Sequence, residues 1–430
     1  MRTQSKLLVA ALIALASPAA ASEHDPILDA DPFAMAAMLA KPPRYPATRE
    51  YLEGAVAASR LQTQAALSHL RAAWTARGAA PAVARRALTL AGGVLLREGR
   101  YREAGDLLDQ AISQYAATLT PVTRLDMEQV RDAAMGFRDQ PVQTVESRAP
   151  ATLTLTRSKI GLWLAPVDIG GQTRGAVLDT GTSVSTLSAT AAKELGVQML
   201  ARQASIASAT HDAIDTGLAV APTLRIGGVV LHNVIFVVAS DAALSPMGPD
   251  TRIDVILGYP VLRALGRISF QLSDPTKPDS AHQVVIGGAA SRAASNNLRF
   301  EGFDFYVKVK VGGEPQVLFF DSGAARTGFE HRYAQEHPDR LAGLARKTIR
   351  VAGAGGIETR NVAIIPNTSV TVGDQTVALS ELDAELDGSS ADTRDGSLGN
   401  DVLWAKGGFT IDFDRLSLTL GTGDTRRNKP

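Results

Sequence analysis

The spacing of apolar residues changes once along the chain, and this change divides it into two regions. Between residues 51 and 135 apolar positions recur at helical spacing, as in Val83, Ala87, Leu90, Ala91, Val94 and Leu95. Beyond residue 150 apolar and polar positions alternate, and Val, Ile, Leu, Thr and Gly become frequent, which is typical of strands. The pattern predicts a helical domain over residues 25–140, a linker over residues 141–150 and a β-rich region that follows it.

The β-rich region repeats a pattern at an offset of 142 residues (321 minus 179). At this offset residues 165–171 align with residues 307–313, each segment being a strand that ends in Gly-Gly. Residues 177–181 align with residues 319–323, each an apolar strand followed by an aspartate in a turn of small residues. A strand, a turn and an acid therefore recur in register.

The register continues downstream of both acids. An Ile-Leu-Gly block at residues 256–262 corresponds to a Ser-Leu-Gly block at residues 397–403, and each copy ends in a predicted hairpin. We therefore predict two lobes, over residues 151–288 and 298–424, joined by a link at residues 289–297.

The first residues have the pattern of a secretory signal. Arg2 and Lys6 precede a short apolar run, and small residues at 19–21 supply a cleavage site. The run is shorter than the roughly 20 apolar residues of a spanning helix, so we expect a signal peptide over residues 1–21 and no membrane span after its removal. The chain has no cysteine, which excludes disulfides and thiolate chemistry. Export without disulfides favours the periplasm of a Gram-negative bacterium.

The equal numbers of acidic and basic residues argue against nucleic acid and anionic membranes as partners. Lys plus Arg equals Asp plus Glu at 44 each, so no net field attracts nucleic acid or an anionic membrane. We expect neither as a partner.

One helical segment resembles a tetratricopeptide unit, with small and aromatic residues at Gly99, Tyr101, Ala104, Leu108 and Ala111. Such units need about three copies to bury their faces. An ordinary helical bundle packed on the next domain is therefore an equal alternative, and either form could bind a partner protein.

The sequence Asp179-Thr180-Gly181-Thr182-Ser183 follows an apolar strand and precedes the Ile-Leu-Gly block, and this combination resembles the retropepsin-like aspartic proteases. The resemblance extends to the second copy at Asp321. It implies a multidomain α+β chain in which the helical domain precedes two mainly-β, closed barrel-like lobes related by a pseudo-twofold axis. It also implies that the two acids face one another across a cleft.

Two aspartates that face one another can act together as a general acid and a general base. Two carboxylates held about 3 Å apart cannot both ionise cheaply, so they share a proton. The ionised member can take a proton from water, and the protonated member can stabilise the oxyanion that forms on a peptide carbonyl. We therefore predict an aspartic endopeptidase that acts on peptides or proteins and needs no metal or organic cofactor.

The residues beside the acids have predicted supporting roles. Gly181 and Gly323 allow a tight turn without a Cβ beside the acid. By resemblance, Thr180 and Ser322 would hydrogen-bond across the contact between the lobes. Further positions implied by resemblance continue the loops or pack behind them, namely Thr182, Ala324, Leu257, Gly258, Leu398 and Gly399.

The second loop departs from the family pattern. Ala324 fits it, whereas Ala325 and Arg326 fit less well. An arginine here could lower the proton affinity of the acids or face solvent. The departure leaves open a catalytically inactive peptide-binding or scaffold protein with the same fold.

The family's flaps would map to residues 204–213 and 349–357. The second segment contains Gly353, Gly355 and Gly356, which would allow a lid to move. A third Asp-Thr-Gly, at residues 215–217, follows no apolar strand and has no counterpart in the repeat, so we interpret it as a turn or the start of a strand.

Other chemistries lack their motifs. The seven His include no H-E-x-x-H, so a zinc peptidase has no ligand set. Neither the Lys of a phosphate-binding loop nor the G-x-S-x-G of a serine hydrolase is present in the sequence. We favour a monomer with one composite site, and a homodimer that exchanges its lobes remains the alternative.

Overall fold

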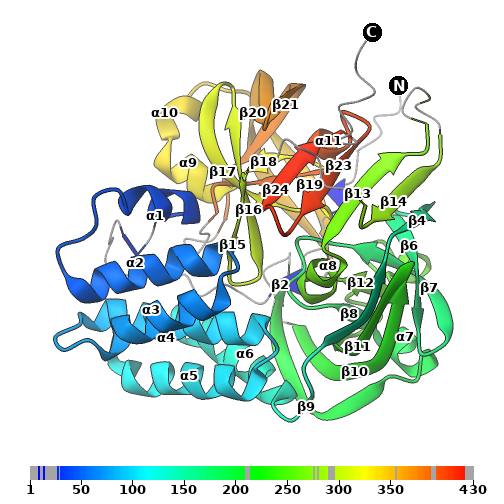
Figure 1. Cartoon of the computed structure of the whole chain (residues 1–430). Helices are drawn as coiled ribbons and strands as arrows, with labels where there is room; N and C mark the ends of the chain where they lie inside the picture. Colours follow the sequence, from blue (N-terminus) through cyan, green and yellow to red (C-terminus); the bar gives the residue numbers. More distant parts are fainter. Residues whose placement is uncertain are drawn as a thin grey trace.

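The computed structural model describes residues 8–9, 13–14, 27–28, 30–208, 214–274, 277, 280–288, 296–353, 356–388 and 394–421. Its secondary structure combines an N-terminal group of helices with two large sheets and one smaller sheet (Figure 1). The predicted α+β class is confirmed. None of the helices among the described residues has the length and apolar character needed to cross a membrane.

Several helices of the helical domain begin with a proline. Proline favours this position because its φ is fixed near the helical value and the first turn does not need its missing N–H. Asp31 also caps the first helix by accepting from the backbone N–H groups of Phe33 and Ala34. The helices are α1 (Pro32–Met38), α2 (Pro46–Ser59), α3 (Thr63–Thr75), α4 (Pro81–Arg97), α5 (Tyr101–Gln114), the 3₁₀ turn η1 (Ala116–Thr118) and α6 (Pro121–Phe137).

Successive helices of this domain pack closely. A Cβ on Gly92 of α4 would lie 2.8 Å from Leu108 Cγ of α5, so glycine permits the close approach. Gly99, at φ +75°, makes the turn between these two helices. The tetratricopeptide-like pattern stays a prediction.

The helical domain also packs on the first lobe. Phe137 of α6 and Tyr101 of α5 belong to the same buried apolar cluster as Leu218 of the first lobe. Figure 1 shows α6 beside strands β9 and β10. The two regions therefore share a core instead of being separated by a free linker.

The first large sheet has the strand order β2-β9-β10-β11-β8-β12-β7-β6-β5 and closes on itself through pairing of β10 with β6. Its elements are β5 (Thr156–Arg157), β6 (Trp163–Ile169), β7 (Gln172–Leu178), β8 (Thr186–Ser188), α7 (Ala189–Glu194), β9 (Gln198–Ser208), β10 (Ile214–Ile226), β11 (Gly228–Ala239), the 3₁₀ turn η2 (Pro249–Thr251), β12 (Val255–Leu257) and α8 (Tyr259–Leu265).

The second large sheet has the order β1-β19-β20-β21-β18-β22-β17-β16-β15 and closes through β20 and β16. Apart from the first strand, this is the order of the first sheet with each label raised by ten. Its elements are β15 (Leu298–Glu301), β16 (Asp304–Val311), β17 (Glu314–Phe320), β18 (Gly328–Phe329), α9 (His331–Glu336), α10 (Pro338–Leu341), β19 (Arg346–Gly353), β20 (Gly356–Val372), β21 (Gln375–Glu385), β22 (Gly396–Leu398) and α11 (Asn400–Leu403).

A third sheet joins the two lobes, with the order β24-β23-β13-β14-β4. Antiparallel pairing of β13 with β23 places Phe270 on Phe409, with ring centroids 4.6 Å apart. The two hairpins expected at the ends of the lobes are thus parts of one sheet. Its strands are β4 (Ala151–Thr154), β13 (Arg267–Leu272), β14 (His282–Ile286), β23 (Gly408–Asp412) and β24 (Ser417–Leu420).

The segment expected as a linker, residues 141–150, connects α6 to the first lobe and also contains a strand. It contains β3 (Thr144–Ala149), which pairs with β11 along the edge of the first lobe. All six residues of β3 are exposed. Its sequence, Thr-Val-Glu-Ser-Arg-Ala, also lacks the alternation of apolar and polar positions that would predict a strand.

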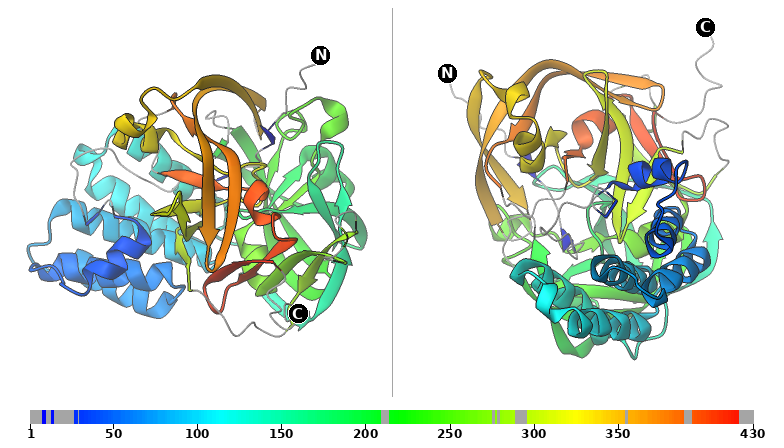
Figure 2. Two further views of the ribbon diagram at one scale, coloured as in Figure 1. Left: turned by 90° about the horizontal axis from the view of Figure 1, so that it is seen from above. Right: turned by 90° about the vertical axis from the view of Figure 1, so that its left-hand side faces the viewer.

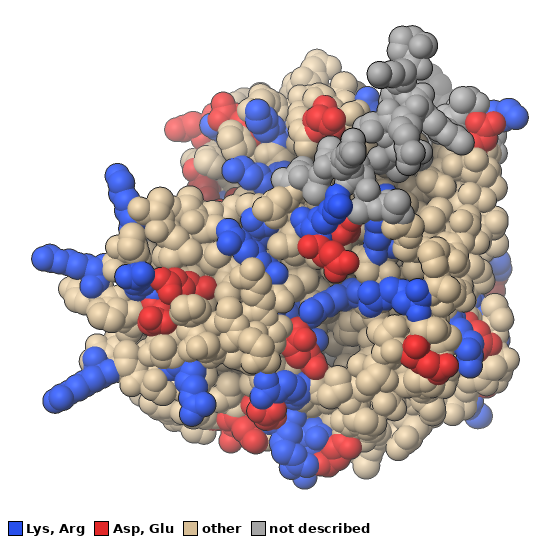
Figure 3. Space-filling view, in the orientation of Figure 1, with Lys and Arg blue, Asp and Glu red and all other residues tan. Residues whose placement is uncertain are grey.

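Two short strands lie inside the predicted signal peptide. β1 (Leu8–Val9) pairs with β19 of the second lobe, and β2 (Ile13–Ala14) pairs with β9 of the first. The N-terminal segment therefore touches both lobes, and Figure 2 shows its short strands within the β region. In Figure 3 acidic and basic side chains are interspersed over the visible face.

Candidate active site

Each candidate aspartate follows a strand whose last three residues are buried, β7 in the first lobe and β17 in the second. The backbone N–H of Asp179 donates to the carbonyl of Leu257 at 3.0 Å, and that of Asp321 donates to the carbonyl of Leu398 at 3.1 Å. The parallel neighbours β12 and β22 thus hold the two loops in the same way.

The two aspartates lie against the opposite loops. Both are 0% exposed. A Cβ on Gly181 would lie 2.7 Å from Asp321 Oδ1, and a Cβ on Gly323 would lie 2.8 Å from Asp179 Oδ1. No side chain larger than glycine fits at either position without displacing the carboxyl group. The structure therefore brings Asp179 and Asp321 together, and we call them the carboxyl pair.

Hydroxyl groups connect the two loops across the contact between lobes. Thr180 Oγ1 donates to the carbonyl of Phe320 at 2.8 Å and accepts from the N–H of Ser322 at 2.8 Å. Ser322 Oγ reciprocates, donating to the carbonyl of Leu178 at 3.0 Å and accepting from the N–H of Thr180 at 3.0 Å. These four hydrogen bonds fix one loop against the other.

Asp179 accepts a hydrogen bond on each oxygen. The N–H of Gly181 donates to Oδ1 at 2.8 Å and the hydroxyl of Thr182 donates to Oδ2 at 2.8 Å. Burial raises the pKa of Asp179 well above its usual range, and the nearby charge of Asp321 raises it further, whereas these two hydrogen bonds oppose the shift.

Asp321 has a different set of donors. The N–H groups of Gly323 and Ala324 both donate to Oδ1, at 2.8 and 3.0 Å. Oδ2 is buried, and no donor of the loops reaches it. Burial raises the pKa of Asp321 to about 6, against the effect of the two N–H groups, the positive charge of Arg394 and a hydrogen bond with the Asp179 carboxyl group.

The predicted glycines behind the loops lie in close backbone contact with them. A Cβ on Gly258 would meet the carbonyl oxygen of Thr182 at 2.5 Å, and one on Gly399 would meet the backbone of Arg326 at 2.5 Å. Leu257 and Leu398 supply the carbonyl groups that hold the aspartates, so all four predicted positions contact the loops.

Arg326 lies in an ion network, which is neither of the two arrangements considered from the sequence. Its guanidinium pairs with Glu381 at 2.9 Å and with Asp383 at 3.5 Å, and Lys347 contacts the same two acids. The arginine whose charge acts on Asp321 is Arg394. The irregular residue of the second loop is therefore neutralised by β21.

The predicted flap segments coincide with two hairpins. β9 and β10 form one, and β19 and β20 form the other, where Gly353 pairs with Gly356 at the tip. Gly355 and residues 209–213 lie outside the described residues, as do the side chains of residues 203–215. The third Asp-Thr-Gly lies at the start of β10, within its strand.

A cavity of about 400 Å³ opens beside the second loop. Gly323 and Ala325 line it together with the aromatic side chains of Trp163, Trp404 and Phe409. Val177 and Leu178 of β7 and Phe270 of β13 also line this cavity, whereas neither aspartate does, so it lies beside the loops and not at the carboxyl groups themselves.

Comparison with known proteins agrees with this geometry. Residues 165–261 match the family described as aspartyl protease. The predicted resemblance to the aspartic proteases is confirmed. The matched residues contain Asp179 and Gly258 of the first lobe and none of the second.

Among solved structures, the chain is similar to a retropepsin-like aspartic protease from Rickettsia conorii, at 14% identity over 34% of this chain and 97% of that chain. The TM-score of this comparison is 0.21. No curated protein matches the sequence.

Two further residues of the aspartic-protease-like site were missed from the sequence. Ser185 Oγ accepts from the N–H of Gly258 at 3.1 Å, and Thr327 Oγ1 accepts from the N–H of Gly399 at 3.0 Å. They lie 142 residues apart (327 minus 185), so the repeat register contained the signal. Asn400, whose side chain donates to the carbonyl of Ser322 at 2.9 Å, has no counterpart in the first copy, where Tyr259 follows the glycine.

Side chains that could bind a metal ion lie together in the helical domain, away from the carboxyl pair. Among the described residues, one group of acidic and His side chains could hold an ion, Glu50, Glu53 and His69 on α2 and α3. His69 Nδ1 already lies 2.8 Å from Glu50 and 3.2 Å from Glu53. This group belongs to the helical domain and not to the carboxyl pair.

Proposed function

We propose that the chain is an exported aspartic endopeptidase whose catalytic dyad is Asp179 and Asp321, one from each lobe. The observation that carries this proposal is the carboxyl pair itself. Each acid is fully buried against the glycine of the opposite loop. Carboxyl groups buried in this way without a catalytic use would only destabilise the fold.

In the proposed mechanism the pair holds one proton between its two members. The ionised carboxyl takes a proton from water as the water oxygen bonds to the peptide carbonyl carbon. The protonated carboxyl donates its proton to the carbonyl oxygen, which gives a neutral tetrahedral intermediate. The C–N bond then breaks as the pair donates its proton to the leaving nitrogen and takes a proton from one hydroxyl group of the intermediate, so that an amine and a carboxylic acid leave and the pair again holds one proton.

The surroundings of Asp321 Oδ2 support this mechanism. Three of the four carboxyl oxygens accept hydrogen bonds from the loops. Oδ2 accepts none from the loops, so it is available to share a proton with the neighbouring Asp179 carboxyl group or to accept from the attacking water. We do not divide the acid and base roles between the two residues, because the proton belongs to the pair.

The substrate would bind as an extended strand between the two hairpins. The pairing of β1 with β19 and of β2 with β9 supports this binding mode, because both hairpins accept an added strand through backbone hydrogen bonds. These strands lie in the predicted signal peptide, so its removal would leave both edges open.

Export to the periplasm and a monomeric state are parts of the same proposal. The four hydrogen bonds that the Thr180 and Ser322 hydroxyls make across the contact between the lobes lie within one chain, so one chain would suffice for the site. Mass spectrometry of the exported protein should give an N-terminus at Ser22. Mixing the two single-aspartate variants should restore no activity, whereas restoration would indicate exchange of lobes between two chains.

The test of the function is hydrolysis of a mixed peptide library between pH 3 and 8. The wild type and the control Asp374→Asn, which changes an exposed turn residue, should cleave, whereas Asp179→Asn and Asp321→Asn should not. If the wild type binds peptides and never cleaves them, the inactive peptide-binding alternative is correct. Undiminished cleavage by either dyad variant would refute the shared pair.

A further inference from the structure

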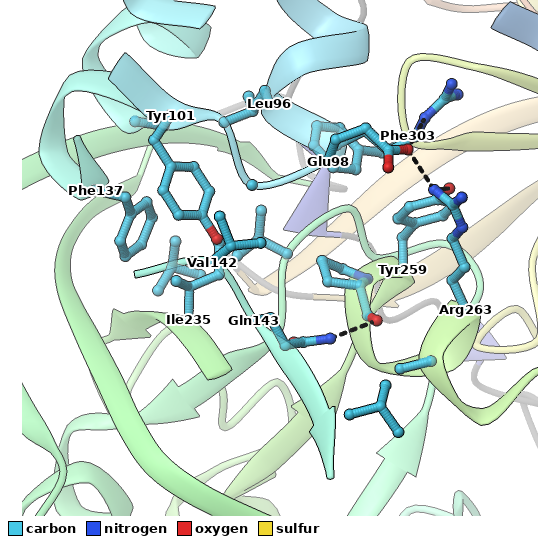
Figure 4. Close-up of a pocket in the computed structure, with 18 of the residues that line it drawn as sticks. Leu96, Glu98, Tyr101, Phe137, Val142, Gln143, Ile235, Tyr259, Arg263 and Phe303 are labelled. Carbon is cyan, nitrogen blue, oxygen red and sulfur yellow. Dashed lines mark hydrogen bonds and ion pairs between the residues drawn. The ribbon is translucent and has the colours of Figure 1, made fainter. Parts of the chain in front are cut away.

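A cavity of about 280 Å³ lies between the helical domain and the first lobe. Figure 4 shows its walls, with Tyr101 and Phe137 of α5 and α6 on one side and Tyr259 and Arg263 of α8 on the other. Val142 and Gln143, just before β3, also line it. Its volume is close to the low end of the roughly 300–1,000 Å³ that is usual for sites of small ligands.

The charged groups around this interdomain cavity favour an anion. Three arginines line it, Arg97, Arg148 and Arg263, against the single carboxylate of Glu98. Glu98 is engaged by Arg263 at 2.6 Å. Arg148 is exposed and forms no ion pair with the described residues, so its fork of donors remains available for a carboxylate.

Two buried polar atoms in the lining lack hydrogen-bond partners. Arg97 is only 6% exposed, and its Nε has no hydrogen-bond partner among the described residues and lies 4.0 Å from Glu98 Oε1, in a long ion pair. Oε1 of Gln143 is likewise buried and unpartnered, while its Nε2 donates to the carbonyl of Pro260 at 2.9 Å. Unpaired buried polar groups are costly, so a bound polar ligand or water would relieve them.

The remaining lining is apolar. Leu96, Phe137, Val142, Ile235 and Val237 face the cavity. An occupant therefore needs an apolar body as well as an anionic end. We propose that this interdomain cavity is a binding site for a small monocarboxylate with an apolar chain, whose carboxylate lies against Arg148 and Arg263.

The cavity adjoins the back of the Asp179 loop. Val184, which lines the cavity, lies two residues after Thr182. Tyr259, also in the lining, donates its N–H to the carbonyl of Thr182 at 3.0 Å, and the hydroxyl of Thr182 donates to Asp179. A ligand that contacts Tyr259 of α8 is therefore separated from Thr182, the hydrogen-bond donor to Asp179, by Tyr259 alone.

Through the hydrogen bond between Tyr259 and Thr182, a ligand in the interdomain cavity would regulate the carboxyl pair. If the ligand shifts the position of Thr182, ligand affinity and affinity for a transition-state analogue at the carboxyl pair change each other by the same factor. This coupling rests on the proposed function, whereas the binding of the carboxylate does not.

Calorimetric titration of the full-length protein tests the binding, with octanoate as the probe and octylamine as the probe of opposite charge. Octanoate should bind saturably, and octylamine should bind at least tenfold more weakly. Val142→Trp, which enlarges an exposed side chain of the lining, should narrow the cavity and weaken octanoate binding at least tenfold. Arg148→Gln should weaken it about tenfold, because a hydrogen bond to a charged group is lost.

Matched controls separate the cavity from the rest of the surface. Leu125→Trp places the same side chain on an exposed position of α6, and Arg225→Gln removes an exposed arginine of β10. Neither lines the cavity, and both should bind octanoate like the wild type, with thermal unfolding confirming that all variants are folded. The absence of saturable octanoate binding, equal binding of octylamine, or unchanged binding by Val142→Trp would each overturn the proposal, whatever the peptidase assay shows.

Discussion

The two loops that carry the aspartates share a backbone arrangement and differ in the donors that reach each carboxyl group. Asp179 receives one hydrogen bond on each oxygen, including that from the Thr182 hydroxyl. Asp321 receives both of its hydrogen bonds on Oδ1 from backbone N–H groups, because Ala324 stands where the first loop has Thr182. One side chain therefore makes two similar loops electrostatically unequal.

The residues that follow the loops differ as well. At the 142-residue offset Val184 corresponds to Arg326. Val184 lines the interdomain cavity, whereas Arg326 enters an ion network with β21. The two copies therefore share the residues that hold the aspartates, namely the glycine and the hydroxyl side chain of each loop. They differ in the residues that follow each loop, because the first lobe packs on the helical domain and the second loop faces β21.

The largest expected effect comes from removing either acid. Asp179→Asn and Asp321→Asn should each lower kcat by about 10³–10⁴-fold, and the double variant should be no worse, because the two groups act as one unit. Single-turnover cleavage of one peptide measures all three values. Multiplied losses in the double variant would mean that the acids act independently.

The cross-lobe hydroxyls should have the next largest effect, and an equal one in both lobes. Thr180→Val and Ser322→Ala each leave two buried backbone groups unpaired, which should cost about 2–4 kcal/mol of unfolding free energy. Denaturant unfolding measures this cost. The exposed control Thr376→Val should change the value by less than about 0.5 kcal/mol, and a similar small value for Thr180→Val would show that the hydroxyls do not hold the lobes together.

Thr182 should set the pH dependence of the pair. Its hydroxyl stabilises ionised Asp179, so Thr182→Val should raise the pKa of the pair and move the acidic limb of kcat/KM upward by about one pH unit. Thr182→Ser retains the hydroxyl and should keep the wild-type profile. A downward shift in Thr182→Val, or the same shift in Thr182→Ser, would contradict this assignment.

Arg326 should have the smallest effect on chemistry. Arg326→Val gives the second loop the residue of the first, and the pH–rate profile should move by less than about 0.3 units, because the charge is neutralised and screened. Unfolding free energy should fall by about 1 kcal/mol, since Glu381 and Asp383 then face Lys347 alone. A large change in the profile would mean that Arg326 acts on the carboxyl pair directly.

The sequence predicted features that depend on local pattern and repeat register. The apolar strand before each aspartate, the glycine after it and the helical region all follow from such patterns, and the positions of Ser185 and Thr327 could have followed from the 142-residue offset. Long-range pairings could not be predicted in this way. β3 is exposed along its length, the partners of Arg326 lie 55 and 57 residues away (381 minus 326 and 383 minus 326), and the interdomain cavity exists only where two regions pack together.

The sharing of one proton between Asp179 and Asp321 is the central claim, and carboxyl ¹³C NMR of aspartate-labelled protein tests it most directly, with the Asn variants assigning the two signals. Ordinary aspartates titrate near 3.9. Burial raises the pKa of both members of the pair, so we expect one carboxyl of the pair to remain protonated at pH 5 in the wild type. Two signals that both titrate near 3.9, with no proton held between them at pH 5, would contradict the account.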